Sequence, residues 1–472
     1  MLVEQIYTGC LAQAAYYIES NGEAAIIDPL RDVEGYIQKA ISGNAKIKYV
    51  FETHFHADFV SGHLDLAKQT GATIVYGPTA QPGFEAITAT DGQEFKIGSV
   101  IIKLLHTPGH TLESCCYLLI NEEGKSCILF SGDTIFLGDV GRPDLAQKAA
   151  HMTQEELAGL LYDSIQSKIM PLADEILIYP AHGSGSACGK KLSEDKVDTL
   201  GHQKATNYAL RKGITKQEFI NDVLTGLTKP PQYFPFNVAM NKLGYQNIDE
   251  VLNKGTKPLT VEEFMTIADN TEALLLDTRN PKLFVKGFIP GSVNIGLNGD
   301  FAPWVGALIT NIEQPILFIA EKGKEKEVVT RLARVGYNNT LGYLEGGIEE
   351  WQMAGKSINI IQSVSADELA DSLEQHPTAI LLDVRRNSEF NAQHVIGVEN
   401  IPLNNINAET THLDKDSTYY VHCAAGYRSV IFISIMMARG YNNFINVDGG
   451  FSAIKLNDRL NISHYEEPAT ML

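Results

Sequence analysis

The sequence predicts an α/β protein of several domains, and three observations lead to this fold class. The chain has 472 residues, which is too long for one hydrophobic core and favours about three domains at roughly 100–200 residues each. Short apolar runs alternate with helix-like stretches along its length. The C-terminal half also contains an internal repeat, so two of the predicted domains share one fold.

The segment from residue 1 to residue 245 is predicted to form the first domain. Its predicted strands include AAIID, KYVFETH, ATIVYG, VIIKLLHTPG, CILFSGD and EILIYPAHG, and its predicted helices include VEGYIQKAI and HLDLAKQTG. Polar clusters follow the strands directly, at loops, where sheet-based enzymes usually assemble their sites. The stretch TKPPQYFPFN, rich in proline and aromatic residues, predicts an irregular connector.

The repeat defines two further α/β domains, at residues 246–360 and 361–472. LLLDTRNPKLFVKGFIPGSVNI in the first copy matches ILLDVRRNSEFNAQHVIGVENIP in the second. The copies differ after a predicted apolar strand, where the second copy has HCAAGYRS and the first has IAEKGKEK. Aligning Gly426 with Gly323 places Ala320 opposite Cys423, so thiol chemistry is expected only in the second copy.

Charge and cysteine content exclude several classes of protein. Acidic residues outnumber basic ones by 57 to 38 and no block of lysine or arginine occurs, which argues against a nucleic-acid partner. The N-terminus lacks a basic and apolar leader, and no apolar run is long enough to cross a bilayer, so we expect a soluble, cytoplasmic protein without a membrane partner. The six cysteines form no CxxC pair, which favours free thiols in a reducing compartment.

Four clusters after predicted strands offer imidazole and carboxylate groups for a metal ion. They are His54, His56 and Asp58 in THFHADF, His110 in HTPGHT, Asp133 in FSGDT, and His182 in YPAHG. Metal ligands must converge in space, and the strand-end loops of a sheet can bring them together. Phe59, which comes directly after Asp58, cannot coordinate a metal.

These motifs resemble those of the metallo-β-lactamase superfamily, which implies an αββα sandwich. Hydrolases of that superfamily such as glyoxalase II place Asp-His after His-x-His to hold a second metal, whereas this chain has Phe59. The resemblance therefore implies a mononuclear centre held by His54, His110 and Asp133. Two imidazoles and one carboxylate suit non-haem Fe(II) with open positions for a substrate and O₂.

The chain also resembles persulfide dioxygenases, through this triad and through GDVGRPD and HGSGSACGK. The resemblance implies one Fe(II) per chain, with His56 and His182 as catalytic groups that orient ligands or polarise bound oxygen. Arg142 is a candidate to bind the substrate's carboxylate, with an ordinary loop salt bridge as the alternative. Cys188 is expected near the metal, either packed in a turn or as a thiol that binds substrate sulfur.

The HCAAGYRS segment predicts a reactive thiol. Cys423 ends a strand, and the loop N–H groups, the following helix and Arg428 would lower its pKa and hold an anionic sulfur. The pattern resembles the rhodanese family of sulfurtransferases, which implies that Cys423 carries a persulfide, that Arg428 assists, and that Gly426 helps to bind substrate. The first copy is rhodanese-like by LLLDTRN and IPGSVNI but lacks the cysteine, so we expect an inactive scaffold.

Together the resemblances imply a protein similar to persulfide dioxygenase and sulfurtransferase fusions. We expect oxidation of a low-molecular-weight thiol persulfide by O₂ to sulfite, coupled to sulfur transfer that gives thiosulfate, in a homodimer or homotetramer. The alternatives are a glyoxalase II-like thioester hydrolase with rhodanese domains as passengers, and a persulfide carrier that serves a partner protein. The sequence leaves open whether the thiol is glutathione, bacillithiol, coenzyme A or cysteine.

Overall fold

The computed structural model describes residues 1–376 and 378–467, which divide into two compact units. The first comprises Met1–Ile248, and the second comprises most of the chain from Asp249 on. Each unit contains both helices and strands. The α/β multidomain fold class is therefore confirmed.

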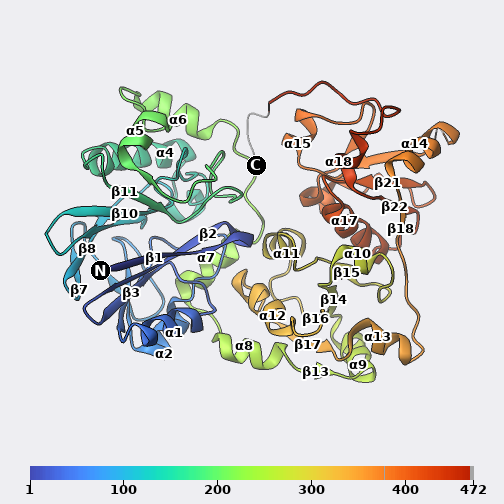
Figure 1. Cartoon of the computed structure of the whole chain (residues 1–472), viewed down its shortest axis with the longest axis horizontal. Helices are drawn as coiled ribbons and strands as arrows, with labels where there is room; N and C mark the ends of the chain where they lie inside the picture. The colour runs from blue at the N-terminus through green and yellow to red at the C-terminus, as the bar shows by residue number, and fades with distance from the viewer. Residues whose placement is uncertain (377, 468–472) are drawn as a thin grey trace. The chain divides into compact units, whose positions relative to one another are not determined.

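Two six-stranded sheets form the centre of the first unit (Figure 1). The first sheet consists, in spatial order, of β1 (Leu2–Thr8), β2 (Gln13–Ser20), β3 (Glu23–Ile27), β4 (Lys46–Phe51), β5 (Thr73–Tyr76) and β6 (Ile87–Thr88). The second consists of β12 (Asp198–Thr199), β11 (Leu177–Pro180), β10 (Ser126–Gly132), β9 (Cys115–Ile120), β8 (Val100–His106) and β7 (Glu94–Ile97).

The main core of this unit lies between the two sheets. Phe51 of the first sheet packs on Tyr117 of the second, with ring centroids 4.8 Å apart. Other apolar side chains pack the helices onto the outer faces of the sheets. The first sheet is covered by α1 (Glu34–Ser42) and α2 (His63–Thr70), and the second by α4 (Gln154–Ser164), α5 (Leu200–Thr206) and α6 (Lys216–Leu224). The result is the expected αββα sandwich.

The predicted strands and helices of the first unit are confirmed, but the predicted irregular connector is partly wrong. Two further helices of the unit are α3 (Gln147–Ala150) and α7 (Phe234–Leu243). Helix α7 begins inside TKPPQYFPFN, with Pro235 in its first turn. Proline is tolerated there because the first N–H groups of a helix have no partner within the helix. The proline therefore starts this helix instead of preventing it.

The second unit contains two five-stranded parallel sheets with the same strand order. One consists of β13 (Pro258–Leu259), β17 (Thr340–Leu344), β16 (Ile316–Ile319), β14 (Leu274–Asp277) and β15 (Val293–Asn294). The other consists of β18 (Gln362–Val364), β22 (Phe444–Val447), β21 (Tyr419–His422), β19 (Ile380–Asp383) and β20 (Glu399–Asn400). The internal repeat is therefore a repeat of structure.

The helices of the second unit also divide between the two copies (Figure 1). Those of the first copy are α8 (Ile248–Gly255), α9 (Val261–Thr271), α10 (Pro281–Phe284), α11 (Phe301–Leu308), α12 (Glu325–Arg334) and α13 (Gly347–Met353). Those of the second are α14 (Ala366–Gln375), α15 (Asn387–Ala392), α16 (Ile406–Glu409), α17 (Tyr427–Ala438) and α18 (Gly450–Ile454).

A buried ion pair recurs at the same place in both copies. Arg279 Nη2 lies 2.6 Å from Asp277 Oδ2, and Arg385 Nη2 lies 2.6 Å from Asp383 Oδ2. In the second copy the Asn400 amide donates to the carbonyls of Asp383 and Arg385, and the first copy makes the equivalent bonds. These residues join neighbouring strand ends, so they hold the domain together in the copy with a cysteine and in the copy without one.

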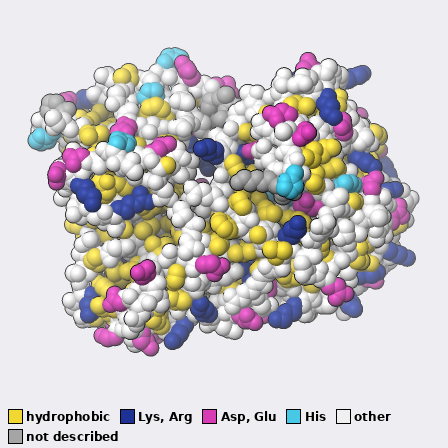
Figure 2. Space-filling model, turned by 180° about the vertical axis from the view of Figure 1, so that it is seen from behind, with side chains coloured by type: hydrophobic (Ala, Val, Ile, Leu, Met, Phe, Trp, Pro, Cys, Tyr) yellow, Lys and Arg dark blue, Asp and Glu magenta, His cyan; other side chains and the backbone are white. Residues whose placement is uncertain are grey.

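Neither the helices nor the visible surface charge of the described residues stands out. No helix in this part of the chain combines the length and the apolar character that crossing a bilayer requires. On the face shown in Figure 2, basic side chains are scattered among acidic ones and do not gather in one patch.

Candidate metal centre and thiol loop

Three of the predicted ligands meet at loops that follow strands. His54 follows β4, His110 follows β8, and Asp133 follows β10. The Nε2 atoms of His54 and His110 lie 3.8 and 3.4 Å from Asp133 Oδ2, and all three side chains are buried. Such separations suit ligands that share one ion at metal–ligand distances of about 2.0–2.2 Å. Asp133 Oδ2 has no hydrogen-bond partner among the described residues, so it is available to a metal.

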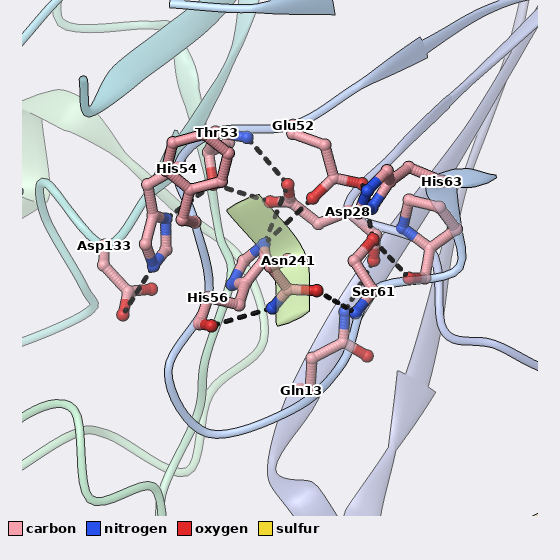
Figure 3. A network of polar contacts seen from close by, with 12 residues as sticks. Gln13, Asp28, Glu52, Thr53, His54, His56, Ser61, His63, Asp133 and Asn241 are labelled. Atoms are coloured by element: carbon pink, nitrogen blue, oxygen red, sulfur yellow. Dashed lines mark hydrogen bonds and ion pairs between the residues drawn. The ribbon is translucent and has the colours of Figure 1, made fainter. Parts of the chain in front are cut away.

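The neighbours of both histidines turn their Nε2 atoms towards this centre. The Thr53 hydroxyl donates to Asp28 Oδ2 at 2.8 Å and lies 3.0 Å from His54 Nδ1, so Thr53 accepts the hydrogen of that ring nitrogen (Figure 3). His110 Nδ1 lies 2.8 Å from the carbonyl oxygen of Arg142 and donates to it. Hydrogen bonds of this kind fix the tautomer of a ligating histidine. The two imidazoles are therefore set for metal binding by the protein itself.

The protonation states also suit a metal site. Burial, and then the neighbouring His56, lower the pKa of His54 well below its usual value, so the ring is neutral. Burial alone would raise the pKa of Asp133, but His182, His54 and His110 outweigh it and hold that pKa below the usual range. Metal ligands must be deprotonated. The residues present therefore fit a divalent metal ion.

A second group of possible ligands lies beside the triad. His182 Nδ1 donates to Asp133 Oδ1 at 2.8 Å. His182 Nε2 lies 2.8 Å from Asp58 Oδ2, but the angle between them does not suit a hydrogen bond. Cys188 joins Asp58 and His182 in a buried group that could hold a metal. Burial, followed by the charges of Asp58 and Asp133, raises the pKa of the Cys188 thiol well above its usual value. The sequence predicts Cys188 near the metal, and the structure places its sulfur in this second group of possible ligands.

His56 and Phe59 occupy the side of the centre where a binuclear enzyme would need further ligands. His56 Nε2 lies 3.0 Å from Asp28 Oδ1 and 3.7 Å from Glu52 Oε2, so the ring faces these buried carboxylates (Figure 3). The Phe59 ring packs on His56 with centroids 4.3 Å apart and lies 6.5 Å from the His182 ring. Phe59 is fully buried. The apolar ring of Phe59 therefore lies beside His56 and His182.

The geometry of Arg142 favours the loop salt bridge over the predicted substrate contact. Its Nε and Nη2 atoms donate to the two carboxylate oxygens of Asp144 at 2.7 and 2.8 Å. It also donates to the carbonyls of Ala187 and Thr228 and is only 1% exposed. The guanidinium is thus occupied within the chain, and its role is to join the loops around the metal centre.

Asn241 of α7, which no sequence motif marks, holds the loop that carries His54 and His56. Its Nδ2 atom donates to the carbonyls of His56 and Phe59, both at 2.8 Å, and its Oδ1 atom accepts from the N–H of Ser61 at 2.9 Å. One buried amide therefore satisfies three backbone groups of the loop that follows His54 (Figure 3). The sequence predicts an irregular connector at the start of this helix, so it gives no signal for the role of Asn241.

Replacing Asn241 by Ala is expected to lower metal affinity on the order of 10- to 100-fold, the usual range for residues that support ligands. Three backbone groups would lose their buried partner, which allows the loop that carries His54 to move. Metal titration of the apoprotein measures the effect. Asn241→Asp keeps the acceptor for Ser61 but places a carboxylate oxygen against two carbonyl oxygens, so it is expected to bind metal at least as weakly as Asn241→Ala. Equal affinities for all three proteins would contradict this role.

Cys423 begins a short loop between β21 and α17. The N–H of Gly426 donates to Cys423 Sγ at 3.1 Å, and Gly426 has a φ of 101°, a left-handed conformation that favours glycine. The sulfur also lies 3.7 Å from the Ser429 hydroxyl oxygen. The loop thus brings the predicted residues together, with a backbone N–H directed at the sulfur. The cysteine is 1% exposed.

Arg428 lies beside the thiol but is paired with a carboxylate. Its Nη1 and Nη2 atoms lie 2.5 and 2.8 Å from the two oxygens of Glu389. Burial alone would lower the pKa of Arg428, but Glu389, and after it Cys423, raise it. The guanidinium therefore stays charged near the sulfur, and Glu389 fixes its direction. Glu389 is a second residue that sequence reasoning did not identify.

Comparisons with known proteins agree with this architecture. Residues 8–182 match the metallo-beta-lactamase superfamily model, and residues 260–354 and 365–457 match the rhodanese-like domain. A crystal structure of a metallo-beta-lactamase from Staphylococcus aureus subsp. aureus COL is 32% identical with a TM-score of 0.63, over 73% of this chain and 98% of that chain. The structure of ETHE1 from Myxococcus xanthus is 26% identical with a TM-score of 0.44, over 52% of this chain and 99% of that chain.

Curated relatives match the chain only in part. The cytoplasmic hydroxyacylglutathione hydrolase of Arabidopsis thaliana is 35% identical over 138 residues, which are 28% of this chain and 53% of that protein. The chain thus spans about half the length of this relative. By the family matches and the Staphylococcus aureus structure, the chain belongs to the metallo-β-lactamase superfamily and carries two rhodanese-like domains after its metallo-β-lactamase domain.

Proposed function

We propose that the first domain is an Fe(II)-dependent persulfide dioxygenase and that the Cys423 domain transfers sulfane sulfur to its product. The observation that carries the proposal is the meeting of His54, His110 and Asp133, with Phe59 in the place of a ligand for a second metal. Two imidazoles and one carboxylate are the ligand set of many mononuclear non-haem iron sites. Fe(II) held there would supply redox chemistry and open positions for a thiolate and dioxygen.

The proposed first reaction is R–S–SH + O₂ + H₂O → R–SH + H₂SO₃. The outer sulfur is oxidised, dioxygen is reduced, and the thiol R–SH is released. The protein's own residues position the ligands for this step. Thr53 holds the His54 ring, and His182 donates to Asp133 Oδ1 and leaves Oδ2 for the metal. The carbonyl of Arg142 holds the His110 ring.

The proposed second reaction uses sulfite as the acceptor. Cys423 takes the outer sulfur of another persulfide, which gives Cys–S–SH and R–SH. Sulfite then attacks that outer sulfur, so that thiosulfate forms and the cysteine thiol is regenerated. The N–H of Gly426 and the charge of Arg428 support this role, because both stabilise a negative sulfur at this position.

Oxygen uptake by the Fe(II)-loaded chain tests the proposal most directly. The substrates are the persulfides of glutathione, bacillithiol, coenzyme A and cysteine, each with product analysis for sulfite and thiosulfate. We expect persulfide-dependent oxygen consumption with at least one of them. Equal activity in an iron-free, zinc-loaded preparation would refute a dioxygenase.

A thioester hydrolase is the second candidate, and one observation favours it. Asp58, His182 and Cys188 could hold a second ion next to the triad, and binuclear sites of this kind activate water. The curated relatives named hydroxyacylglutathione hydrolase agree with such chemistry. Metal analysis separates the candidates, since the dioxygenase requires about one iron per chain and the hydrolase two metal ions.

Phe59→His is expected to raise the metal content from about one towards two ions per chain and to lower persulfide-dependent oxygen uptake. The new imidazole would lie near His182, where Asp58 and Cys188 already offer ligand atoms. Elemental analysis and oxygen uptake measure the two effects. Phe55→His is the matched control, because Phe55 is buried in the same loop but packs on Tyr76. An unchanged metal content in Phe59→His would show that Phe59 does not block a second ion.

A further inference from the structure

The residue that follows the sulfur-binding loop is bonded to the other rhodanese-like domain. Tyr427 comes directly after Gly426 and is the first residue of α17. Its hydroxyl donates to the carbonyl of Gly296 at 2.7 Å, and Gly296 lies just beyond β15 of the first copy. Both copies belong to the same compact unit, and Figure 1 shows α17 beside β15. The cysteine loop is therefore fastened to the domain that has no cysteine.

Gly299 of the first copy provides the space for the Tyr427 ring. A Cβ atom on Gly299 would lie 2.4 Å from the ring, which is closer than any real contact. The backbone of Gly299 is not in the left-handed region, and the three atoms nearest to an alanine Cβ there would all belong to the tyrosine ring. The close approach of Tyr427 is thus the reason for a glycine at this position.

A second contact fixes the same face of α17. The N–H of Asn294 in β15 donates to the Ser434 hydroxyl at 3.0 Å. Ser434 is seven residues after Tyr427, so the two side chains lie on one side of the helix, two turns apart. Burial, and then the charge of Asp300, raise the pKa of Tyr427, which keeps its hydroxyl a neutral donor. The helix is held at its start and along its length.

This contact bears on the sulfur because Gly426 is the flexible point of the loop. Gly426 has a left-handed φ of 101° and has open space where a side chain would be, so the local chain alone fixes its conformation weakly. Its N–H is the group that faces Cys423 Sγ. Holding Tyr427 on one side limits the rotation of Gly426 and keeps that N–H directed at the sulfur.

We propose that the first rhodanese-like domain keeps the Cys423 loop in its anion-binding shape, with Tyr427 as the positioning residue held by Gly296 and Gly299. The domain without a cysteine is thus a working part of the sulfur-transfer site and more than a spacer. This inference rests on the proposed role of Cys423 as a sulfur carrier. Its test uses the reactivity of the thiol itself, which can be measured whether or not that role is correct.

The experiment follows alkylation of Cys423 by iodoacetamide in the full-length chain, as a function of pH, by mass spectrometry of the peptide that contains it. Tyr427→Phe removes only the bond to Gly296, and we expect roughly fivefold slower alkylation at neutral pH. Gly299→Ala is expected to slow the reaction further, because it displaces the ring. In a Tyr427→Ala background, Gly299→Ala should add little, since the clashing partner is gone.

Tyr337→Phe is the matched control. Tyr337 is buried in the first copy and its hydroxyl donates to the carbonyl of Ile309, away from the cysteine loop. It should lower thermal stability about as much as Tyr427→Phe while leaving alkylation of Cys423 unchanged. If Cys423 in Tyr427→Phe and in Gly299→Ala is alkylated at the wild-type rate at every pH, the proposal is overturned. If Gly299→Ala does not fold, the alkylation rate of Tyr427→Phe alone tests the proposal. A different outcome is that both variants are alkylated more slowly, as expected, but the wild type transfers no sulfur. That result would reject the carrier role of Cys423 and leave the positioning role of Tyr427 intact.

Discussion

Asp133→Ala is expected to empty the metal centre and to lower persulfide-dependent oxygen uptake by more than about 100-fold, since even residues that only support ligands typically account for 10- to 100-fold. Asp133 Oδ2 is the oxygen nearest to both His54 Nε2 and His110 Nε2 and has no other partner in the described chain. Its other oxygen accepts from His182, so the substitution also releases that ring. Iron content and oxygen consumption, measured on the same preparation, check the result.

The control for this substitution is Asp174→Ala. Asp174 lies on the surface of the same unit, where it pairs with Lys204. Exposed pairs of this kind contribute about 0–1 kcal/mol to stability, so the control should keep its iron and its activity. Retention of one iron per chain in Asp133→Ala would show that the ligand set is wrong, and Asp58, His182 and Cys188 would become the next set to test.

Cys423→Ser is expected to leave oxygen uptake nearly intact and to change the product from thiosulfate to sulfite. Loss of the nucleophile should lower enzyme-dependent thiosulfate formation on the order of 100-fold or more, because no other group in the loop can carry sulfur. The metal centre proposed to react with oxygen lies in a different unit of the chain. Product analysis under turnover with excess persulfide, corrected for the spontaneous reaction of sulfite with persulfide, measures the change.

Cys127→Ser serves as the control for that experiment. Cys127 is half-buried in β10, and its thiol donates a hydrogen bond to the carbonyl of Leu119. We therefore expect Cys127 to take no part in sulfur transfer. We expect the wild-type ratio of thiosulfate to sulfite from this variant. An unchanged ratio in Cys423→Ser as well would mean that the second rhodanese-like domain serves another acceptor.

Local sequence patterns predicted most of the fold because the signals agree along the chain. The apolar runs before His54, His110 and Asp133 are strands β4, β8 and β10, and ligands at strand-end loops meet wherever the strands are brought together. The internal repeat predicted two similar domains, and both have the same strand order. The predicted thiol loop likewise lies between a strand and a helix.

The parts that sequence did not predict depend on contacts between distant segments. Asn241 supports the metal loop across more than 180 residues of sequence, and no local pattern marks such a partner. For Arg142 the sequence left two partners open, a substrate carboxylate and a loop salt bridge, and only the structure shows that Asp144 two residues later pairs with its fork. Tyr427 was overlooked because its partners lie in the other copy of the repeat.

The series of hydrogen bonds from Asp28 through Thr53 to His54 has a consequence for how the protein binds its metal. These bonds orient the ligand with protein groups alone, and the main core lies between the sheets rather than around the ligands. We therefore expect folding to be independent of the metal, unlike in small zinc domains, where metal binding supplies the folding free energy. A chelator should remove the iron and leave a folded apoprotein with nearly unchanged circular dichroism. Added Fe(II) should then restore activity as fast as the ion enters the site, without refolding. A cell short of iron would therefore keep a folded apoprotein that becomes active again without synthesis of new protein.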